Sequence, residues 1–309
     1  MALRLSPKWI QEYCPHNLST DKLAEVLCRY GLETEVIEDI TIDPKIIIGE
    51  ITSIEKHPDA DKLNVCKVDT GSELLQIVCG CPTVVDAKKV LVAPVGTKIP
   101  GMTLKPVKLR GVESQGMICS LKELGLAEEG SGIYHVHENI ETGTHLIDYL
   151  KHDSQLLEID ITPNRGDCLS IYGIARDLSA VLGKALAPYP EGDISKIAVT
   201  DKLFTVSSKA VSAYDALVGE VDSSARVPLY MANRLRQAGM GLNHTVVDIL
   251  NYVMLELGQP MHAFDQESLT LPLMMQDGSS QAFTLLNDES YQPNAWDTLV
   301  CDQKAPQAL

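Results

Sequence analysis

Residues 57–117 contain three short motifs whose side chains could contact a nucleic acid. They read His57-Pro58-Asp59-Ala60-Asp61-Lys62-Leu63, Ile77-Val78-Cys79-Gly80 and Lys108-Leu109-Arg110-Gly111-Val112-Glu113-Ser114-Gln115-Gly116-Met117. Lys62, Lys108 and Arg110 can supply positive charge for phosphates. Ser114 and Gln115 can supply hydrogen-bonding groups. For His57 we favour a turn residue positioned by Pro58 over a catalytic role.

The charge balance restricts where a nucleic acid could bind. The formal net charge is −16, which argues against indiscriminate binding because affinity for phosphates comes from Lys and Arg. A binding surface must therefore be local. Residues 88–112 are the candidate, since they contain no acidic residue and six basic ones: Lys88, Lys89, Lys98, Lys105, Lys108 and Arg110. The alternative is a set of solvated lysines on strands.

The eight cysteines do not have the spacing of a zinc site or of a disulfide framework. Cys79 and Cys81 are separated by one residue, and most of the others lie in apolar stretches. We expect reduced thiols and no metal site. Arg4 and Pro7 argue against a signal peptide, and no apolar run approaches the roughly 20 residues of a membrane helix. We expect a cytoplasmic protein.

Local signals predict individual elements. Ser6 and Pro7 have the form of a helix start. Gly31 has the form of the C-terminal end of the next helix. Short β-rich runs separated by Gly and Pro turns fill residues 46–148, which is typical of a small barrel. The run Thr245-Val246-Val247-Asp248 has the form of a capping box that opens another helix.

These elements predict an α+β protein of several domains. Residues 1–40 together with 151–189 form a discontinuous α/β domain in this reading. Residues 41–150 form an inserted, five-stranded oligonucleotide-binding barrel. Residues 190–309 form the last domain.

The three motifs, in this order, resemble a tRNA-binding barrel. That barrel is shared by the beta chain of bacterial phenylalanyl-tRNA synthetase, the C-terminal modules of methionyl-tRNA synthetase and free-standing tRNA-binding proteins. Two further regions resemble the beta chain alone: 161–169 with 173–177, and 251–265. The chain thus resembles the N-terminal part of the synthetase beta subunit, more weakly between 190 and 225 and after 268.

The resemblance implies that residues 190–309 are the start of an editing domain. A hydrophobic pocket for phenylalanine rejects tyrosine only about a hundredfold, so a second, hydrolytic site is needed. By resemblance, Asn251, Pro260 and His262 would line that site, with His262 positioning the tRNA 3′ end or a water. The alternative is a packed core histidine between Pro260 and Phe264.

The sequence departs from the family pattern at three places. Leu250 stands where the family usually has Thr, and Ala213 where it usually has Arg. The sequence also ends at Leu309, before the family's glycine-rich continuation and the acidic residue expected to recognise the tyrosine hydroxyl. We therefore expect an incomplete editing pocket.

The resemblance also implies partners. The intact enzyme would join phenylalanine to its tRNA with ATP and Mg²⁺, at a site on the alpha subunit of an alpha2beta2 heterotetramer. We expect this portion to bind tRNA(Phe), to contribute to hydrolysis of tyrosyl-tRNA(Phe) and to bind no cofactor itself. The alternatives are a non-catalytic tRNA-binding module and a structural domain without affinity for RNA.

Overall fold

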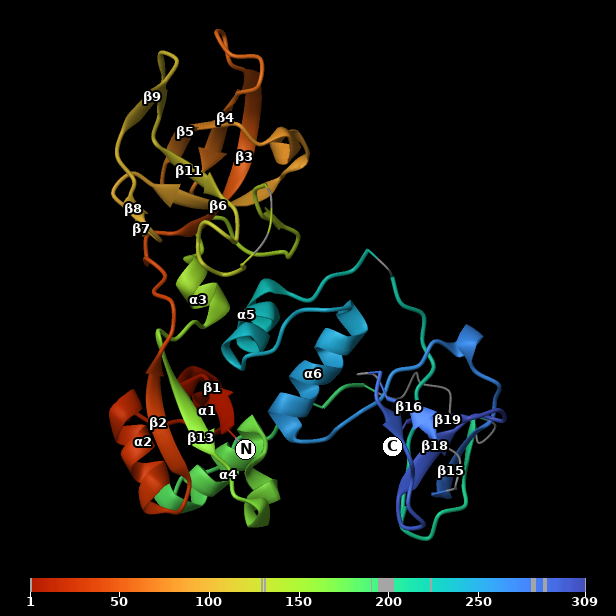
Figure 1. Cartoon of the computed structure of the whole chain (residues 1–309). Helices are drawn as coiled ribbons and strands as arrows, with labels where there is room; N and C mark the ends of the chain where they lie inside the picture. The colour runs from red at the N-terminus through yellow and green to blue at the C-terminus, as the bar shows by residue number, and fades with distance from the viewer. Residues whose placement is uncertain are drawn as a thin grey trace. The chain divides into compact units, whose positions relative to one another are not determined.

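The computed structural model describes residues 2–128, 130, 132–189, 191–193, 203–222, 224–278, 282–285 and 288–308. The chain divides into two compact units, Met1–Pro188 with Arg226–Gln259, and Tyr189–Ala225 with Pro260–Leu309. Figure 1 labels their helices and strands. Helices and antiparallel sheets, one of them barrel-shaped, occur together in the first unit, which confirms the predicted α+β class with a barrel.

A three-stranded antiparallel sheet in the first unit joins segments that are far apart in the sequence. Strand β13 (Gln155–Asp160) lies between β1 (Ala2–Leu5) and β2 (Glu33–Glu38). Leu157 and Ile159 of β13 are fully buried, whereas Glu158 between them is only partly buried. β1 and β2 precede the barrel in the sequence and β13 follows it. The sheet therefore pairs the segment before the barrel with the segment after it.

Helices complete the core around this sheet. They are α1 (Pro7–Tyr13), α2 (Thr20–Arg29), η2 (Pro163–Cys168) and α4 (Ile171–Leu182). The Ser6 hydroxyl accepts a hydrogen bond from the Trp9 amide, which confirms the predicted helix start. At the other end of this core, Gly183 closes α4 with a φ of 61°, a left-handed conformation that glycine adopts without strain.

The inserted segment folds into a nearly closed antiparallel barrel. Its sheet has the order β11–β6–β3–β4–β5, and β12 also pairs with β6. The strands are β3 (Ile47–Lys56), β4 (Asn64–Asp69), β5 (Leu74–Cys79), β6 (Lys89–Pro94), β11 (Gly116–Cys119) and β12 (His135–Val136). A Cβ atom on Gly49 would lie 2.7 Å from Val68 Cγ1 and 2.8 Å from Val92 Cγ2. Both valines are fully buried, so a larger residue at position 49 would collide with the packed barrel interior.

The long connection from β6 to β11 carries two small hairpins. They pair β7 (Lys98–Ile99) with β8 (Met102–Thr103), and β9 (Val107–Leu109) with β10 (Val112–Ser114). The Gln115 amide donates a hydrogen bond of 2.8 Å to the Gln76 carbonyl on β5. This bond helps to close the barrel. The short helices η1 (Pro82–Asp86) and α3 (Leu146–Leu150) complete the segment.

Two more helices, α5 (Leu229–Gln237) and α6 (Thr245–Leu257), belong to the first unit. Leu235, Tyr252 and Leu255 are buried in the same core as α1 and α4. They fall in the predicted domain 190–309, yet their apolar side chains pack with the N-terminal helices. The domain boundaries as a whole stay a prediction.

The start of α6 differs by one residue from the predicted capping box. His244 is the N-cap residue, and its side chain accepts a hydrogen bond from the Val246 amide. The Asp248 carboxylate is buried and accepts a bond of 2.8 Å from the Asn243 amide. The prediction of Thr245 as the cap is therefore wrong, because an imidazole nitrogen takes the acceptor role expected of a hydroxyl.

The second unit is built around a sheet of four strands in the order β14–β15–β18–β19 among the residues described. They are β14 (Phe204–Val206), β15 (Leu273–Asp277), β18 (Thr298–Cys301) and β19 (Pro306–Ala308). A hairpin of β16 (Phe283–Thr284) and β17 (Ser290–Tyr291) and the short helix η3 (Gln266–Ser268) complete it. Leu273, Met275 and Val300 form its core.

The helices throughout the described part of the chain are too short or too polar to cross a membrane.

Candidate nucleic-acid interface

Two loops meet at one end of the barrel. The first joins β3 to β4 and contains His57, and the second contains the β9–β10 hairpin. The Nε2 atom of His57 lies 2.9 Å from the Leu109 carbonyl oxygen, and its Nδ1 atom accepts a hydrogen bond of 3.0 Å from the Asp59 amide. The imidazole is only 5% exposed. His57 therefore ties the two loops together at one end of the barrel. Figure 1 shows these loops at the ends of β3 and β9.

The β9–β10 turn presents a cation on a constrained backbone. Leu109 pairs with Val112, so Arg110 and Gly111 form a two-residue turn. Their φ values are 45° and 89°, and positive φ at both positions is the mark of a type I′ turn. The Arg110 side chain is exposed and reaches towards the other loop, with Nη1 at 3.5 Å from the Asp59 carbonyl.

The predicted cations differ in what they already contact. Lys62, Lys105 and Lys108 are exposed, and within the described ranges none of them lies within 4.0 Å of a carboxylate. Lys88 is exposed too but lies 3.9 Å from Glu50. The Lys89 ammonium donates to the Ile140 carbonyl. Lys62, Lys105, Lys108 and Arg110 are thus the cations best placed to meet phosphates.

The remaining predicted residues have roles inside the barrel. Ser114 is 2% exposed, and its hydroxyl accepts a hydrogen bond from the Val78 amide and donates one to the Gly116 carbonyl. The Gln115 side-chain oxygen accepts a hydrogen bond from the Gln76 amide. These contacts give Ser114 and Gln115 a structural role in barrel closure. Lys98 is exposed on β7, and its amide donates to Asp43.

A groove of about 610 Å³ lies beside this end of the barrel. Its lining includes the apolar side chains of Val107, Leu109 and Met117, together with Lys105 and Lys122. Lys122 was not among the residues predicted from the sequence, because it follows the acid-free segment and stands next to Glu123. The structure brings it to the same groove as Lys105, where the pair could flank an anionic backbone.

The groove also contains the thiol of Cys81. Partial burial acts to raise the pKa of Cys81. Hydrogen bonds to its sulfur from the Thr83 side chain and from the amides of Ile133 and Val84 outweigh that effect and lower the pKa. The neighbouring Cys79 thiol is buried, and burial raises its pKa. The two cysteines of the Cys79-Gly80-Cys81 motif therefore differ in environment, and all eight cysteines of the chain are free thiols.

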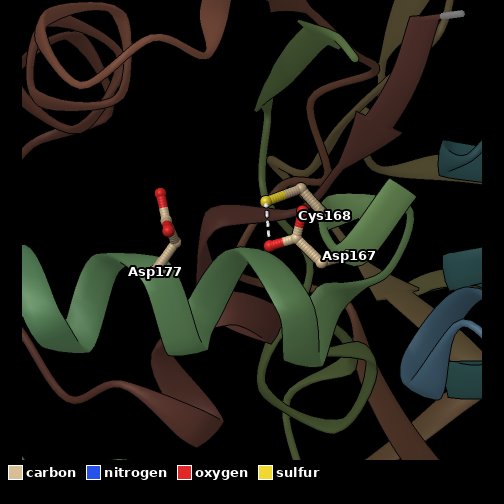
Figure 2. Close-up of side chains that lie close together, drawn as sticks. All are labelled: Asp167, Cys168 and Asp177. Atoms are coloured by element: carbon tan, nitrogen blue, oxygen red, sulfur yellow. Dashed lines mark hydrogen bonds between the residues drawn. The ribbon is translucent and has the colours of Figure 1, made fainter. Parts of the chain in front are cut away.

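One cluster in the first unit has the composition of a metal site, but the side chain of Arg165 already bonds its members. Figure 2 shows Asp167 and Cys168 facing Asp177 of α4, with ligand atoms within 4.8 Å of one another. The Arg165 Nη2 atom lies 2.8 Å from Cys168 Sγ, 2.9 Å from Asp177 Oδ1 and 3.2 Å from Asp167 Oδ2. The guanidinium lowers the pKa of Asp167. A metal ion would have to displace it.

Comparison with known proteins matches two regions of the chain. Residues 46–145 match the family described as "Putative tRNA binding domain", and residues 210–309 match the "B3/4 domain" family. The phenylalanine–tRNA ligase beta subunits of Coxiella burnetii and Hahella chejuensis are 38% and 39% identical to 99% of this chain. Almost the whole chain is therefore similar to a part of the phenylalanine–tRNA ligase beta subunits.

The chain spans about two-fifths of the length of these relatives, 39% of the first and 40% of the second. Among solved structures, a MetRS related protein from Pyrococcus horikoshii aligns with 33% of this chain and 87% of its own length at 26% identity. The TM-score of that alignment is 0.24, which is too low to support a statement about the fold.

The predicted editing residues lie in different units of the chain. Asn251 is half-buried on α6 in the first unit. Pro260 and His262 are exposed in the second unit, and the His262 ring stacks on Phe264 with centroids 6.0 Å apart. Because His262 is exposed, the alternative of a packed core histidine is not supported. A pocket that combines these residues stays a prediction.

Proposed function

We propose that this chain binds tRNA through the end of the barrel where the His57 and Arg110 loops meet. Three observations support the proposal. Residues 46–145 match a tRNA-binding family. Exposed cations lie in the groove, at Lys105, and on the two loops, at Lys62 and Lys108. A two-residue turn with positive φ presents Arg110. The observation that carries most weight is the grouping of these cations at one end of an otherwise acidic chain.

Electrostatics favours a local, oriented contact. With a formal net charge of −16, the chain as a whole repels phosphates, so contact with a backbone is favoured at a local group of cations such as the one at this end of the barrel. Phosphate contacts release counterions, and affinity then falls with salt in proportion to the number of contacts. The groove walls of Val107, Leu109 and Met117 add an apolar surface on which an unpaired base could rest.

A salt titration of tRNA binding tests the proposal. Lys108→Ala with Arg110→Ala removes two exposed cations from the β9–β10 hairpin. We expect weaker binding and a salt slope smaller by about one to two units. The matched control is Lys22→Ala with Arg29→Ala, which removes the same charges from α2, where both residues pair with Glu25. If the two double variants bind alike, the placement of the interface is wrong.

Because almost the whole chain is similar to phenylalanine–tRNA ligase beta subunits, we extend the proposal to the whole protein. The complete beta subunit would act in a phenylalanine–tRNA ligase that uses ATP and Mg²⁺, with its synthetic site on an alpha subunit in an alpha2beta2 assembly. This chain would hold tRNA(Phe) for that enzyme. Binding of an alpha subunit is tested by co-purification of the two full-length chains.

Hydrolytic editing is a second candidate function, favoured by the match of residues 210–309 to the B3/4 family. The exposed imidazole of His262 is accessible to a tRNA 3′ end or to a water. The hydrolysed ester would be tyrosyl-tRNA(Phe), because a phenylalanine pocket discriminates only weakly against an added hydroxyl. A binding module without hydrolytic activity is the alternative, and a deacylation assay separates the two.

A further inference from the structure

We propose that His57 is a positioning residue for tRNA binding, which holds the two cation-bearing loops of the barrel in a fixed relation. This inference rests on the proposed binding of tRNA at this end of the barrel. His57 belongs to the loop that carries Lys62, and its hydrogen bond reaches Leu109 in the hairpin that carries Lys108 and Arg110. The imidazole is thus a buried side-chain link between the two groups of charges, and it is shorter than the exposed 3.5 Å contact from Arg110 to the Asp59 carbonyl.

The hydrogen-bond pattern defines how this link works. The Nδ1 atom of His57 lies 3.0 Å from the Asp59 amide, which can only donate, so Nδ1 must be the acceptor. The proton of a neutral ring is then on Nε2, which donates to the Leu109 carbonyl at 2.9 Å. Nδ1 holds the turn after Pro58, and Nε2 binds the opposite loop. Both hydrogen bonds need the tautomer with its proton on Nε2.

The surroundings show why a fixed link matters for binding. Neither loop has a core of its own, since Lys62, Lys108 and Arg110 are exposed along with most of their neighbours. His57 itself is only 5% exposed, and its two hydrogen bonds are partly buried. Without the link the cations would remain but would have to be ordered on binding, and that ordering costs affinity.

Two charge-neutral substitutions separate the two hydrogen bonds. His57→Gln keeps a side-chain N–H long enough to reach the Leu109 carbonyl but loses the acceptor beside the Asp59 amide. His57→Asn keeps that acceptor and is too short to reach Leu109. Because the Leu109 bond joins the loops, we expect His57→Asn to weaken tRNA binding about threefold to tenfold, the equivalent of one hydrogen bond. His57→Gln should weaken it less.

His145→Gln is the matched control. The His145 side chain also bonds a loop carbonyl, that of Pro44 at 2.7 Å, but it is exposed and lies opposite Ile47 at the beginning of β3. His57 follows the other end of that ten-residue strand, so the two histidines hold opposite ends of the barrel. His145→Gln should leave the tRNA affinity unchanged.

The experiment measures tRNA affinity at several salt concentrations for the full 309-residue chain and these variants, beside their unfolding temperatures. Weaker binding in His57→Asn with the salt slope of the unsubstituted chain, at an unchanged unfolding temperature, supports the proposal, because the same cations then reach the phosphates but must first be ordered. Hydrogen exchange that becomes faster in residues 58–63 and 107–112 of His57→Asn supports it independently of RNA.

Two results would overturn the proposal, and they are distinguishable. If the unsubstituted chain binds tRNA with a clear salt dependence and both His57 variants bind equally well, the positioning role is wrong while the proposed function stands. If the unsubstituted chain shows no salt-dependent binding, the proposed function fails and the role of His57 in it fails as well.

Discussion

Arg234 of α5 places its guanidinium carbon 4.7 Å from the ring centroid of Trp9 on α1. The same guanidinium donates to the Tyr252 hydroxyl at 2.7 Å and to the Glu12 carboxylate. Trp9 in turn stacks on Tyr252 at 4.8 Å. Since Arg234 is only 3% exposed, one cation joins α1 to both α5 and α6 inside the core of the first unit.

Replacing Arg234 should therefore destabilise the first unit strongly. Arg234→Ala leaves Glu12 without its nearest cation and removes the cation–π contact with Trp9. Loss of one partner of a buried ion pair typically costs about 3–5 kcal/mol, and Glu12 is partly exposed, so we expect about 3 kcal/mol. Urea denaturation followed by Trp9 fluorescence measures it. Arg29→Ala, an exposed helix-surface pair with Glu25, should cost below about 0.5 kcal/mol. Equal losses would contradict the prediction.

The imidazole of His152 links the beginning of the barrel to α5. His152 is 1% exposed, and its Nε2 atom lies 2.8 Å from the Ile40 carbonyl. Its Nδ1 atom lies 3.4 Å from side-chain nitrogens of both Asn233 and Gln237. These amide groups donate, so Nδ1 is an acceptor and the ring is neutral. A second proton on the ring would remove that acceptor.

Stability should fall with acidity because of His152. Burial lowers the pKa of His152, and Arg236 acts in the same direction, whereas Ile40 and the carboxylates of Asp39 and Asp153 oppose it. The net pKa is below its ordinary value, so the unfolded chain binds the proton more tightly. The stability that the neutral His152 ring contributes is complete above about pH 6.5. It is lost as the pH falls through the folded-state pKa of His152.

The measurement is the free energy of unfolding of the unsubstituted chain and of His152→Gln, from about pH 7.5 to pH 5. The unsubstituted chain should lose more stability over this interval than His152→Gln. Burial also lowers the pKa of His16, but His16 is present in both proteins, so its effect cancels in the difference. Parallel curves for the two proteins would refute the assignment to His152.

Much of the fold follows from local sequence signals. Ser6 and Pro7 start α1, Gly183 ends α4, and Val- and Ile-rich runs between Gly and Pro turns become the barrel strands, because each signal acts within a few residues. The predicted cap at Thr245 is wrong, because the His244 side chain accepts the amide hydrogen bond instead. Such an error changes a boundary but not the element.

The site was less predictable because it depends on contacts across the sequence. His57 and Leu109 are 52 residues apart, so the motif containing His57 indicates a turn but not a link. Ser114 has the same local polarity as Gln115, and only closure of the barrel buries its hydroxyl. Arg234 lies far from Trp9 in the sequence, and its pattern on α5 gives no sign of the aromatic surface that it meets.

The Arg110–Gly111 turn should be sensitive to a single methyl group. Gly111→Ala meets no atom within 4 Å, so its cost comes from the positive φ alone and should be about 1 kcal/mol of unfolding free energy. Gly166→Ala is the matched control, because it also meets open space but has no positive φ in the left-handed region. It should cost little. Comparable losses in the two variants would show that backbone conformation is not the cause.

The cluster of Asp167, Cys168 and Asp177 should not take up a metal ion. Arg165 already bonds all three side chains, and burial raises the pKa of the Cys168 thiol to about 11, which disfavours the thiolate that a zinc ion needs. Neither Zn²⁺ nor EDTA should change the unfolding temperature. A rise of several degrees with Zn²⁺ that disappears in Cys168→Ser would show that the guanidinium is displaced.

Deacylation of tyrosyl-tRNA(Phe) should distinguish an editing centre from a binding module. If the second unit retains an editing site, the 309-residue chain should hydrolyse the ester, and His262→Ala should reduce the rate by about tenfold or more, the range typical of a positioned acid, base or orienting group. Since His262 is exposed, the substitution should not affect folding. The exposed His137 on the barrel gives the control His137→Ala, which should keep the full rate.

The outcomes of this assay lead to different conclusions. Hydrolysis that is lost only in His262→Ala would place the imidazole at the ester. Hydrolysis that is equal in both variants would exclude His262 from the reaction and move the search to the half-buried Asn251. Absence of hydrolysis in the unsubstituted chain, together with salt-dependent tRNA binding, would identify the chain as a binding module. Binding of phosphates by the cations of the barrel does not require a group that attacks an ester.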